Sequence, residues 1–366
     1  MKLAFTADIH LGNHRRFGGE MTSGLNRRFA ATVDVLARSV ALAAKHSADA
    51  FCVLGDLFDT SKPTPQELAA VMELFDEWNP RMQFHLLLGN HDQVSDGEGD
   101  HALAPLGYLS NVTVHEKPEM IGNVLALPFR VGAAQDWLPE AVYRASLDAN
   151  PEAVLVHLGI ADESTPPYLR GASDSITTDQ LFAVMGKHGI GNAFAGNWHQ
   201  HRSWSQEGRN ITQCGALVPT GFDNPGIDGY GKLIIYEAGK PPTVVPVVGG
   251  PRFVTGVYEE IDLADLQASA DLGHAVYARF HARPKHVKEA QAALRALQDR
   301  GTLVAFEVLP DREAVSATAK MTARMTRNAT TVDEAVATYV AKTQMPEGAK
   351  REHVLALVQQ YLARSV

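Results

Sequence analysis

The sequence has few of the features that mark several classes of protein. Its 366 residues include two cysteines, Cys52 and Cys214, which stand alone without CxxC spacing and are interpreted as reduced core residues. No run of about 18 apolar residues occurs, which excludes a membrane-spanning helix. A strand-like run begins at Lys2 and leaves no room for a signal peptide. We therefore expect a cytoplasmic protein.

The sequence does contain short apolar runs that each end in Asp, Asn or His. The residues that follow the five runs are Asp8-Ile9-His10, Gly55-Asp56, Gly89-Asn90-His91-Asp92, His157 and His199-Gln200-His201. Such runs, separated by helical patterns, predict the parallel strands of an α/β sheet. Because ligands gather outside the carboxyl ends of these strands, residues far apart in the sequence are expected to share one site.

The side chains expected to converge form a candidate metal shell: Asp8, His10, Asp56, Asn90, His157, His199 and His201. Imidazole nitrogen with carboxylate or amide oxygen suits manganese, iron or zinc. Seven ligands are too many for one ion with an open catalytic position, so two ions sharing a bridging carboxylate are expected. Any one of these residues alone is more often a cap or a core residue, but five motifs together favour a metal site.

The sequence has no excess of positive charge, with 33 Lys and Arg against 42 Asp and Glu and a formal net charge of −9. This argues against a nucleic-acid partner, since phosphate binding is largely electrostatic. Two divalent ions would, however, outweigh the carboxylates of the metal shell and attract a phosphodiester. The basic residues Arg15, Arg16 and Arg202 lie near the motifs and are candidate substrate contacts, although a solvated surface explains them equally well.

In this order and at these separations, the motifs resemble the calcineurin-like metallophosphoesterase superfamily over roughly the first 245 residues. Three further stretches resemble the SbcD-type nuclease subunits of bacterial and phage double-strand-break repair complexes: Asp8 to Gly12, Gly55 to Thr60 and Pro251 to Val254. The resemblance implies an α/β fold of two packed mixed sheets flanked by helices. A small α+β capping domain and a helical C-terminal tail would complete the chain.

The resemblance also implies a role for each residue of the metal shell. Asp56 would bridge two divalent ions, most simply Mn²⁺, with Mg²⁺, Fe²⁺ or Zn²⁺ as alternatives. The first ion would take Asp8, His10 and His201, and the second Asn90, His157 and His199. The catalytic residue would be His91, which stabilises the transition state or protonates the leaving oxygen, and Asp92 would hold its ring.

The sequence departs from the family pattern at two positions. The usual last motif is Gly-His-x-His, and Gly196 to His201 fits it either with His199 and His201 or with Asn197 and His199. We favour the first alignment because it keeps two histidines. Asp59 stands where archaeal and eukaryotic relatives often carry a histidine, which removes one histidine partner for His91.

Three segments are expected along the chain. Residues 1–248 form the phosphoesterase domain, in which 162–175 is a long loop. Gly249-Gly250-Pro251 predicts a linker. It opens a β-β-α-β capping domain at 249–310, whose helix at 285–299 should turn Ala292, Leu294 and Leu297 inward. Residues 311–366 form a helical tail with an apolar stripe that packs on the cap or meets a partner.

Three functions remain open. The favoured one is a DNA exonuclease and endonuclease that acts as a homodimer with an SbcC-like ATPase, since a cap and a helical tail accompany the metal shell. The second is a phosphatase or cyclic-nucleotide phosphodiesterase for small molecules, which ordinarily needs neither addition. The third is a weakly catalytic scaffold for the ATPase, and the intact ligand set argues against it.

Overall fold

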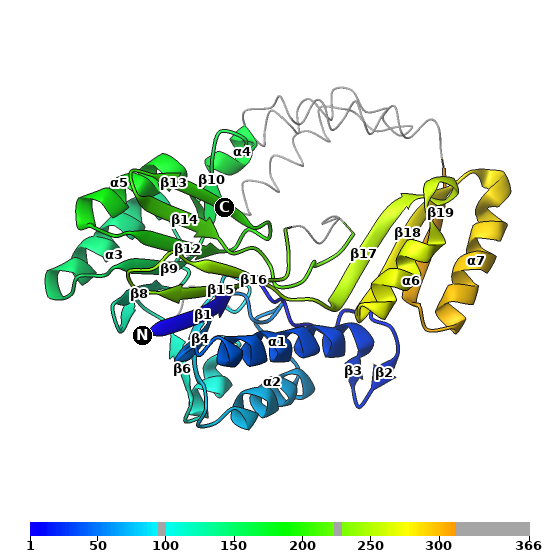
Figure 1. Ribbon diagram of the computed structural model, residues 1–366, viewed down its shortest axis with the longest axis horizontal. Coiled ribbons are helices and arrows are strands. Elements are labelled where there is room, and N and C mark those ends of the chain that lie inside the picture. Colours follow the sequence, from blue (N-terminus) through cyan, green and yellow to red (C-terminus); the bar gives the residue numbers. More distant parts are fainter. Residues whose placement is uncertain (94–99, 223–228, 312–366) are drawn as a thin grey trace, which may run out of the picture.

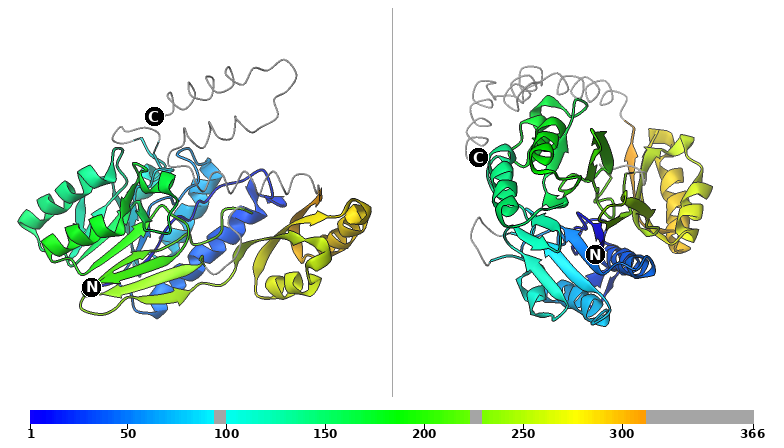
Figure 2. Two further views of the ribbon diagram at one scale, coloured as in Figure 1. Left: turned by 90° about the horizontal axis from the view of Figure 1, so that it is seen from above. Right: turned by 60° about the vertical axis from the view of Figure 1, so that its left-hand side comes forward.

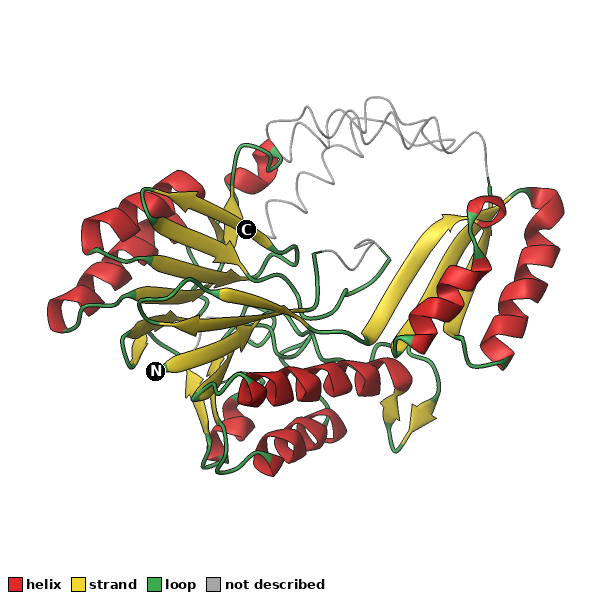
Figure 3. Cartoon of the chain, viewed as in Figure 1, coloured by secondary structure: helices red, strands yellow, loops and turns green. Residues whose placement is uncertain are grey.

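Two six-stranded mixed sheets form the centre of the computed structural model, which describes residues 1–93, 100–222 and 229–311 (Figures 1 and 3). The first sheet contains, in spatial order, β16 (Thr243–Pro246), β15 (Lys232–Glu237), β1 (Lys2–Thr6), β4 (Ala50–Leu54), β5 (Gln83–Leu87) and β6 (Val112–His115). The second contains β13 (Arg202–Gln206), β14 (Arg209–Gln213), β12 (Asn192–Gly196), β9 (Ala153–His157), β8 (Val124–Leu127) and β7 (Glu119–Ile121). In the first sheet β1, β4, β5 and β6 pair in parallel, and β15 pairs antiparallel with both β1 and β16. In the second sheet β14, β12, β9 and β8 pair in parallel, and the edge strands β13 and β7 are antiparallel. These pairings confirm the predicted mixed sheets.

The two sheets pack face to face through a buried apolar layer. Phe5 of β1 lies against Phe194 of β12, with ring centroids 4.5 Å apart, and Tyr236 of β15 lies 5.2 Å from Phe194. Cys52 and Cys214 are part of the same layer as free thiols. Burial raises the pKa of both thiols, so they are unreactive core residues, as predicted.

Helices cover the outer face of each sheet. α1 (Arg27–Lys45) and α2 (Pro65–Glu77) pack on the first sheet, and α3 (Ala134–Asp148) and α5 (Thr178–His188) pack on the second. Each of these helices buries an apolar stripe of helical period, in agreement with the helical patterns expected between the strands. A 3-10 turn, η1 (Ala104–Tyr108), precedes β6, and the short β2 (Met21–Thr22) and β3 (Leu25–Asn26) precede α1. No helix among the described residues is long and apolar enough to cross a membrane.

The loop predicted for residues 162–175 is more ordered than expected. It lies between β10 (Gly159–Ala161) and β11 (Ser175–Thr177), and it contains the short helix α4 (Pro167–Arg170). The Asp162 carboxylate accepts hydrogen bonds from the N–H groups of Ser164 and Thr165, which fixes the turn into α4. The strand β13 was also missed, because its polar sequence carries no apolar alternation.

Residues 250–310 form a three-stranded parallel sheet instead of the predicted β-β-α-β unit. Its elements are β17 (Gly250–Val257), η2 (Tyr258–Glu260), α6 (Leu263–Asp271), β18 (His274–Ala282), η3 (Pro284–His286), α7 (Val287–Asp299) and β19 (Leu303–Pro310). The prediction was wrong because neighbouring parallel strands need a crossover, which α6 supplies between β17 and β18. Gly250 lies inside β17 and is not a linker residue. Leu294 and Leu297 are buried as predicted, whereas Ala292 is exposed and Ala290 takes its place.

This small sheet lies beside one end of α1 (Figures 1 and 2). Phe253 of β17 stacks on Tyr277 of β18, and the Phe222 ring lies 5.0 Å from Phe253. The Arg28 guanidinium of α1 lies 4.9 Å from the centroid of the Phe253 ring. Aromatic and cationic side chains therefore join the two parts. The predicted tail at 311–366 lies, apart from Asp311, outside the described residues.

Candidate metal centre

The carboxyl ends of five strands from both sheets meet at one place. They bring together the predicted residues Asp8, His10, Asp56, Asn90, His91, His157 and His199. The N–H groups of Ile9 and His10 both donate to the Asp56 carbonyl, which ties the first two motifs together. Asp8, His10 and Asp56 all have a positive φ near 50°, a conformation that costs roughly 1–2 kcal/mol per residue. The surrounding fold therefore imposes the orientation of these side chains.

The ligand atoms form three overlapping groups, in each of which the atoms lie within 4.8 Å of one another. The groups are Asp8, His10 and His199; His10, Asp56 and His91; and Asp8, Asp56 and His157. Asp8, His10 and Asp56 each belong to two groups. Sharing of this kind fits two neighbouring ions better than one.

The Asp56 carboxylate occupies the middle of this arrangement. Its Oδ2 atom lies 3.7 Å from His10 Nε2 and 3.5 Å from His157 Nε2. The Asn90 Oδ1 atom lies 2.9 Å from the same His157 nitrogen. Asp56 therefore faces ring nitrogens on two sides, as a bridging carboxylate requires, and Asn90 and His157 lie together on one of those sides.

Contacts with groups outside the centre, a hydrogen bond for His157 and an ion pair for His10, orient these two rings. His157 Nδ1 donates to the Leu54 carbonyl at 2.7 Å, so Nε2 is the ring atom that can bind a cation in exchange for its proton. His10 Nδ1 lies 3.3 Å from Asp59 Oδ1, and its Nε2 atom lies 3.0 Å from His199 Nε2. Asp59, which stands where some relatives carry a histidine, thus holds the His10 ring. This role of Asp59 was not predicted, although its position was noted.

The Asp8 carboxylate shows that the donor set suits cations. Its Oδ1 atom accepts the Asn197 N–H at 2.9 Å, whereas the buried Oδ2 atom has no hydrogen-bond partner among the described residues. A buried carboxylate oxygen without a partner is costly, and a divalent cation beside it would remove that cost. The residues present therefore fit a centre of two metal ions.

The pKa values show how strongly the buried groups act on one another. Burial raises the pKa of Asp8 to about 6. Burial opposes the charged form of His157 as well, but Asp56 and Asp8 raise the pKa of that ring to about 9. Burial and the neighbouring His10 lower the pKa of His199 to about 4. Metal ligation requires deprotonated ligands, so cations compete with the proton on His157.

His91 differs from the other histidines because its ring is exposed. Its Nδ1 atom donates to the Asp59 carbonyl at 3.0 Å, and its ring lies 4.7 Å from that of His10. The prediction that Asp92 holds this ring was wrong. The buried Asp92 carboxylate instead accepts the N–H groups of Gly89, Asp56 and Phe58 at 2.9–3.2 Å, and so joins the loops that carry Asp56 and Asn90.

The last motif also differs from the favoured alignment. His199 lies with Asp8 and His10, in the place expected for His201. Asn197, with a φ of 82°, turns the chain after β12, and by His201 the chain is about to enter β13. His201 donates from Nδ1 to the Cys214 carbonyl and is in none of the three groups found in the described parts of the chain. The alignment that pairs Asn197 with His199 therefore explains the position of His199. The Asn197 side chain itself donates to Asp174 and does not join the three groups.

The model of the family described as calcineurin-like phosphoesterase matches residues 1–201. The chain belongs to this family. The phosphoesterase is 26% identical over 299 residues to the SbcD subunit of the nuclease SbcCD from Rhodobacter capsulatus, and the match covers 68% of this chain and 69% of that protein.

Among solved structures, the phosphoesterase is similar to a protein of Thermus thermophilus, with 12% identity and a TM-score of 0.42. That match covers 67% of this chain and 98% of the other. A dimetal phosphatase from Danio rerio is 11% identical, with a TM-score of 0.41, and the match covers 68% and 99% of the two chains.

The basic residues predicted to contact substrate have different surroundings in the phosphoesterase. Arg202 pairs with Asp162, and Arg16 pairs with Glu307 of β19 at 3.1 Å. Arg15 lines a pocket of about 600 Å³ together with Lys62, beside the metal centre at Asp59. Arg15 therefore has the most suitable position, and a role in substrate binding stays a prediction for all three.

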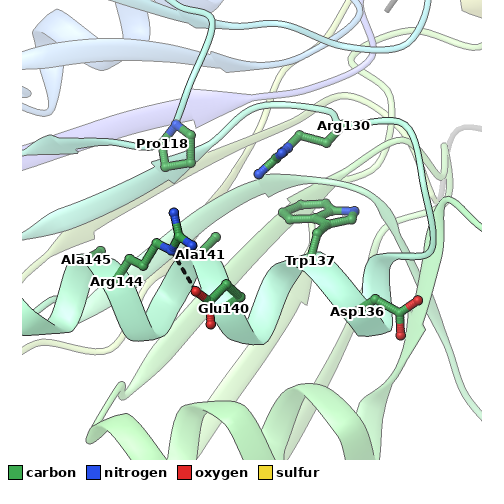
Figure 4. A pocket seen from close by; sticks show the side chains of 8 residues that line it. All are labelled: Pro118, Arg130, Asp136, Trp137, Glu140, Ala141, Arg144 and Ala145. Carbon is green, nitrogen blue, oxygen red and sulfur yellow. Dashed lines mark hydrogen bonds and ion pairs between the residues drawn. The ribbon is translucent and has the colours of Figure 1, made fainter.

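A separate hollow of about 620 Å³ lies against α3 (Figure 4). Arg130 is 6.0 Å from the centroid of the Trp137 ring, and Arg144 pairs with Glu140 at 2.6 Å. This hollow is lined by none of the predicted site residues. The metal centre is therefore the site that the motifs of the family build.

Proposed function

We propose that this phosphoesterase is a two-metal DNA nuclease, a phosphodiesterase that processes DNA ends together with an SbcC-like ATPase. The observation that supports two-metal chemistry most strongly is the position of Asp56 Oδ2 between His10 Nε2 and His157 Nε2. Asp8, His10 and His199 would hold one ion, and Asn90 and His157 the other. Manganese suits this nitrogen and oxygen set, with magnesium, iron and zinc as alternatives.

The bound ions would supply an activated water and neutralise the phosphate oxygens during in-line displacement. The chain itself supplies the proton for the leaving group. Because His91 Nδ1 donates to the Asp59 carbonyl, its Nε2 atom is the one that can exchange a proton. The ring is exposed, so it can reach the oxygen of a long polymer. We assign His91 as the general acid.

The proposal of a DNA substrate rests on the similarity to a nuclease subunit. That similarity covers 68% of this chain, more than residues 1–201 alone can supply. It therefore includes residues outside the family match. We propose residues 1–248 as the nuclease domain, 249–310 as a cap beside the DNA and 311–366 as the segment that contacts the ATPase in a homodimeric complex. Arg15 and Lys62 provide positive charge next to the metal centre for a DNA backbone.

The test is cleavage of end-labelled duplex DNA in manganese, compared with hydrolysis of 2′,3′-cyclic nucleotides and of phosphate monoesters. We expect degradation of DNA that requires the metal and that Asp56→Ala abolishes. Addition of a purified SbcC-like ATPase with ATP should extend degradation along the duplex. Hydrolysis of small phosphate esters with no cleavage of DNA, with or without the ATPase, would contradict the proposal.

A further inference from the structure

A pocket of about 820 Å³ opens directly beside the metal centre and is lined by residues that follow β12 and by residues in and before α4. Its lining includes His199, which lies with Asp8 and His10 at the centre, and the neighbouring Trp198. The volume falls within the range of small-molecule sites, about 300–1,000 Å³. A group attached to a phosphate at the centre could therefore extend into this pocket.

Trp198 is held with one face of its indole against the backbone of Gly159. A Cβ atom built on Gly159 would lie 2.3 Å from Cε2, 2.4 Å from Nε1 and 2.7 Å from Cδ2 of the indole. Because these three adjacent ring atoms lie at similar distances from the Cβ position, that position lies over the face of the indole and not at its edge. Because one face covers Gly159 and Trp198 also lines the pocket, we expect the other face to meet a ligand.

Internal hydrogen bonds hold three polar side chains of the pocket wall, Gln213, Arg202 and Ser164. The buried Gln213 donates to the Gln200 carbonyl at 2.7 Å and accepts the Ile160 N–H at 3.2 Å, so its amide is already engaged at both ends. Arg202 and Ser164 are bonded to each other and to Asp162. These polar groups are already paired within the protein. Gln213, Arg202 and Ser164 are therefore not free to read a base, whereas Trp198 offers an aromatic surface to any base.

We propose that Trp198 stacks on the nucleobase of the nucleotide that stays attached to the scissile phosphate, with little preference among the four bases. This inference rests on the proposed function and adds a binding subsite to it. His199 follows Trp198 directly in the chain and is grouped with Asp8 and His10, so a nucleotide whose phosphate is bound at the centre has the indole within reach. Stacking on an aromatic side chain tolerates any base, because every base has a π face.

The experiment compares two diesters with the same leaving group, thymidine 5′-(p-nitrophenyl phosphate) and methyl p-nitrophenyl phosphate, in manganese. The wild type should show a kcat/KM for the thymidine ester roughly tenfold to hundredfold above that for the methyl ester. Trp198→Leu should lose most of this preference with little change for the methyl ester, and Trp198→Phe should keep much of it. Trp137→Ala, which removes an indole from the hollow on α3, is the matched control and should change neither.

Gly159→Ala is a second test that leaves the indole in place but displaces it. The φ of Gly159 is not in the left-handed region, and the three atoms nearest to an added Cβ all belong to Trp198, so the main effect of alanine is to displace the indole. The thymidine preference should fall as in Trp198→Leu. Gly171→Ala, a change into open space near α4, should leave it unchanged.

Equal kcat/KM for the two diesters in the wild type, an unchanged ratio in Trp198→Leu, or a parallel loss of both activities would each overturn the inference while the nuclease proposal stands.

Calorimetric binding of thymidine 5′-monophosphate and of inorganic phosphate tests the pocket without turnover. If the wild type hydrolysed neither diester, the proposed function would fail. Weaker nucleotide binding in Trp198→Leu would then still support the stacking site, and unchanged binding would overturn it.

Discussion

Asp56 and His91 touch each other and yet occupy opposite environments. The His91 N–H donates to Asp56 Oδ1 at 2.9 Å, so the two residues share one loop contact. Asp56 is buried between two ring nitrogens, and although burial alone would raise its pKa, His157 and His10 hold that pKa below its ordinary value. His91 is exposed. The buried carboxylate is therefore suited to hold cations and the exposed ring to exchange protons.

This difference predicts distinct outcomes for two substitutions. Asp56→Ala should lose activity and both metal ions, because a bridging ligand serves both. His91→Ala should bind two ions per chain and lose roughly a hundredfold or more in kcat on DNA, in line with the loss of a general acid. Mass spectrometric metal analysis of the purified variants distinguishes the roles. A metal-free His91→Ala protein would show that His91 is a ligand.

The last motif gives a second prediction at the residue scale. His199→Ala should reduce the metal content by about one ion per chain, since His199 lies with Asp8 and His10. His201→Ala should retain both ions, because its ring bonds to the Cys214 carbonyl. The two variants differ by two positions and form a matched pair. The reverse result, with metal lost from His201→Ala alone, would restore the alignment favoured by the sequence.

Among the elements, the segment between β10 and α4 depends on one carboxylate. Asp162 accepts hydrogen bonds from Trp204 Nε1, from Ser164 and from Thr165, and pairs with Arg202. Burial would raise its pKa, but the bonds from Ser164 and Trp204 and the charge of Arg202 lower it to about 2. Ionised Asp162 thus stabilises the wall of the Trp198 pocket.

The pH dependence of stability should reveal this carboxylate. Because the folded-state pKa lies below the ordinary value of 3.8, the stabilisation is nearly complete at about pH 5 and is lost as the pH falls towards 2. Asp162→Asn should therefore lower the free energy of unfolding at pH 5 by roughly 1 kcal/mol, since solvent screens part of the interaction, and by less at pH 3. Urea unfolding of both proteins at the two pH values measures this. A constant difference between them would rule out the assignment.

How far the sequence predicts these elements depends on local signals. The strands that lead to Asp8, Asp56 and Asn90 were predicted because each is an apolar run of about five residues next to a helical stripe. The place of His199 was not predictable from ligand type, since it depends on the backbone turn at Asn197. Likewise, α6 was missed although Asp262 caps it, because the flanking strands hid its period. Local periodicity thus identified most strands and helices, while tertiary contacts decided the direction of the side chains.

For the whole molecule, the contact between α1 and the small parallel sheet sets the position of the proposed cap. Arg28 is 8% exposed, donates to the Thr220 carbonyl and lies over the Phe253 ring. The neighbouring Tyr277 hydroxyl is buried without a hydrogen-bond partner among the described residues. The charge and the aromatic faces, and not the hydroxyl, therefore stabilise this contact.

Two substitutions separate these contributions. Arg28→Met should lower the free energy of unfolding by about 1–3 kcal/mol through the lost hydrogen bond and cation–π contact, and should leave the metal content unchanged. Tyr277→Phe should leave stability unchanged or slightly increased, because it removes a buried unpaired hydroxyl. Thermal and urea unfolding provide both values. Destabilisation by Tyr277→Phe equal to that by Arg28→Met would indicate that the hydroxyl is bonded.

The two-metal centre is the claim on which the proposed function depends, and anomalous diffraction from crystals soaked in manganese tests it most directly. We expect two anomalous peaks roughly 3.5–4 Å apart, one on each side of Asp56 Oδ2. One should contact Asp8, His10 and His199, and the other Asn90 and His157. A single peak, or two peaks that do not share Asp56, would contradict the account.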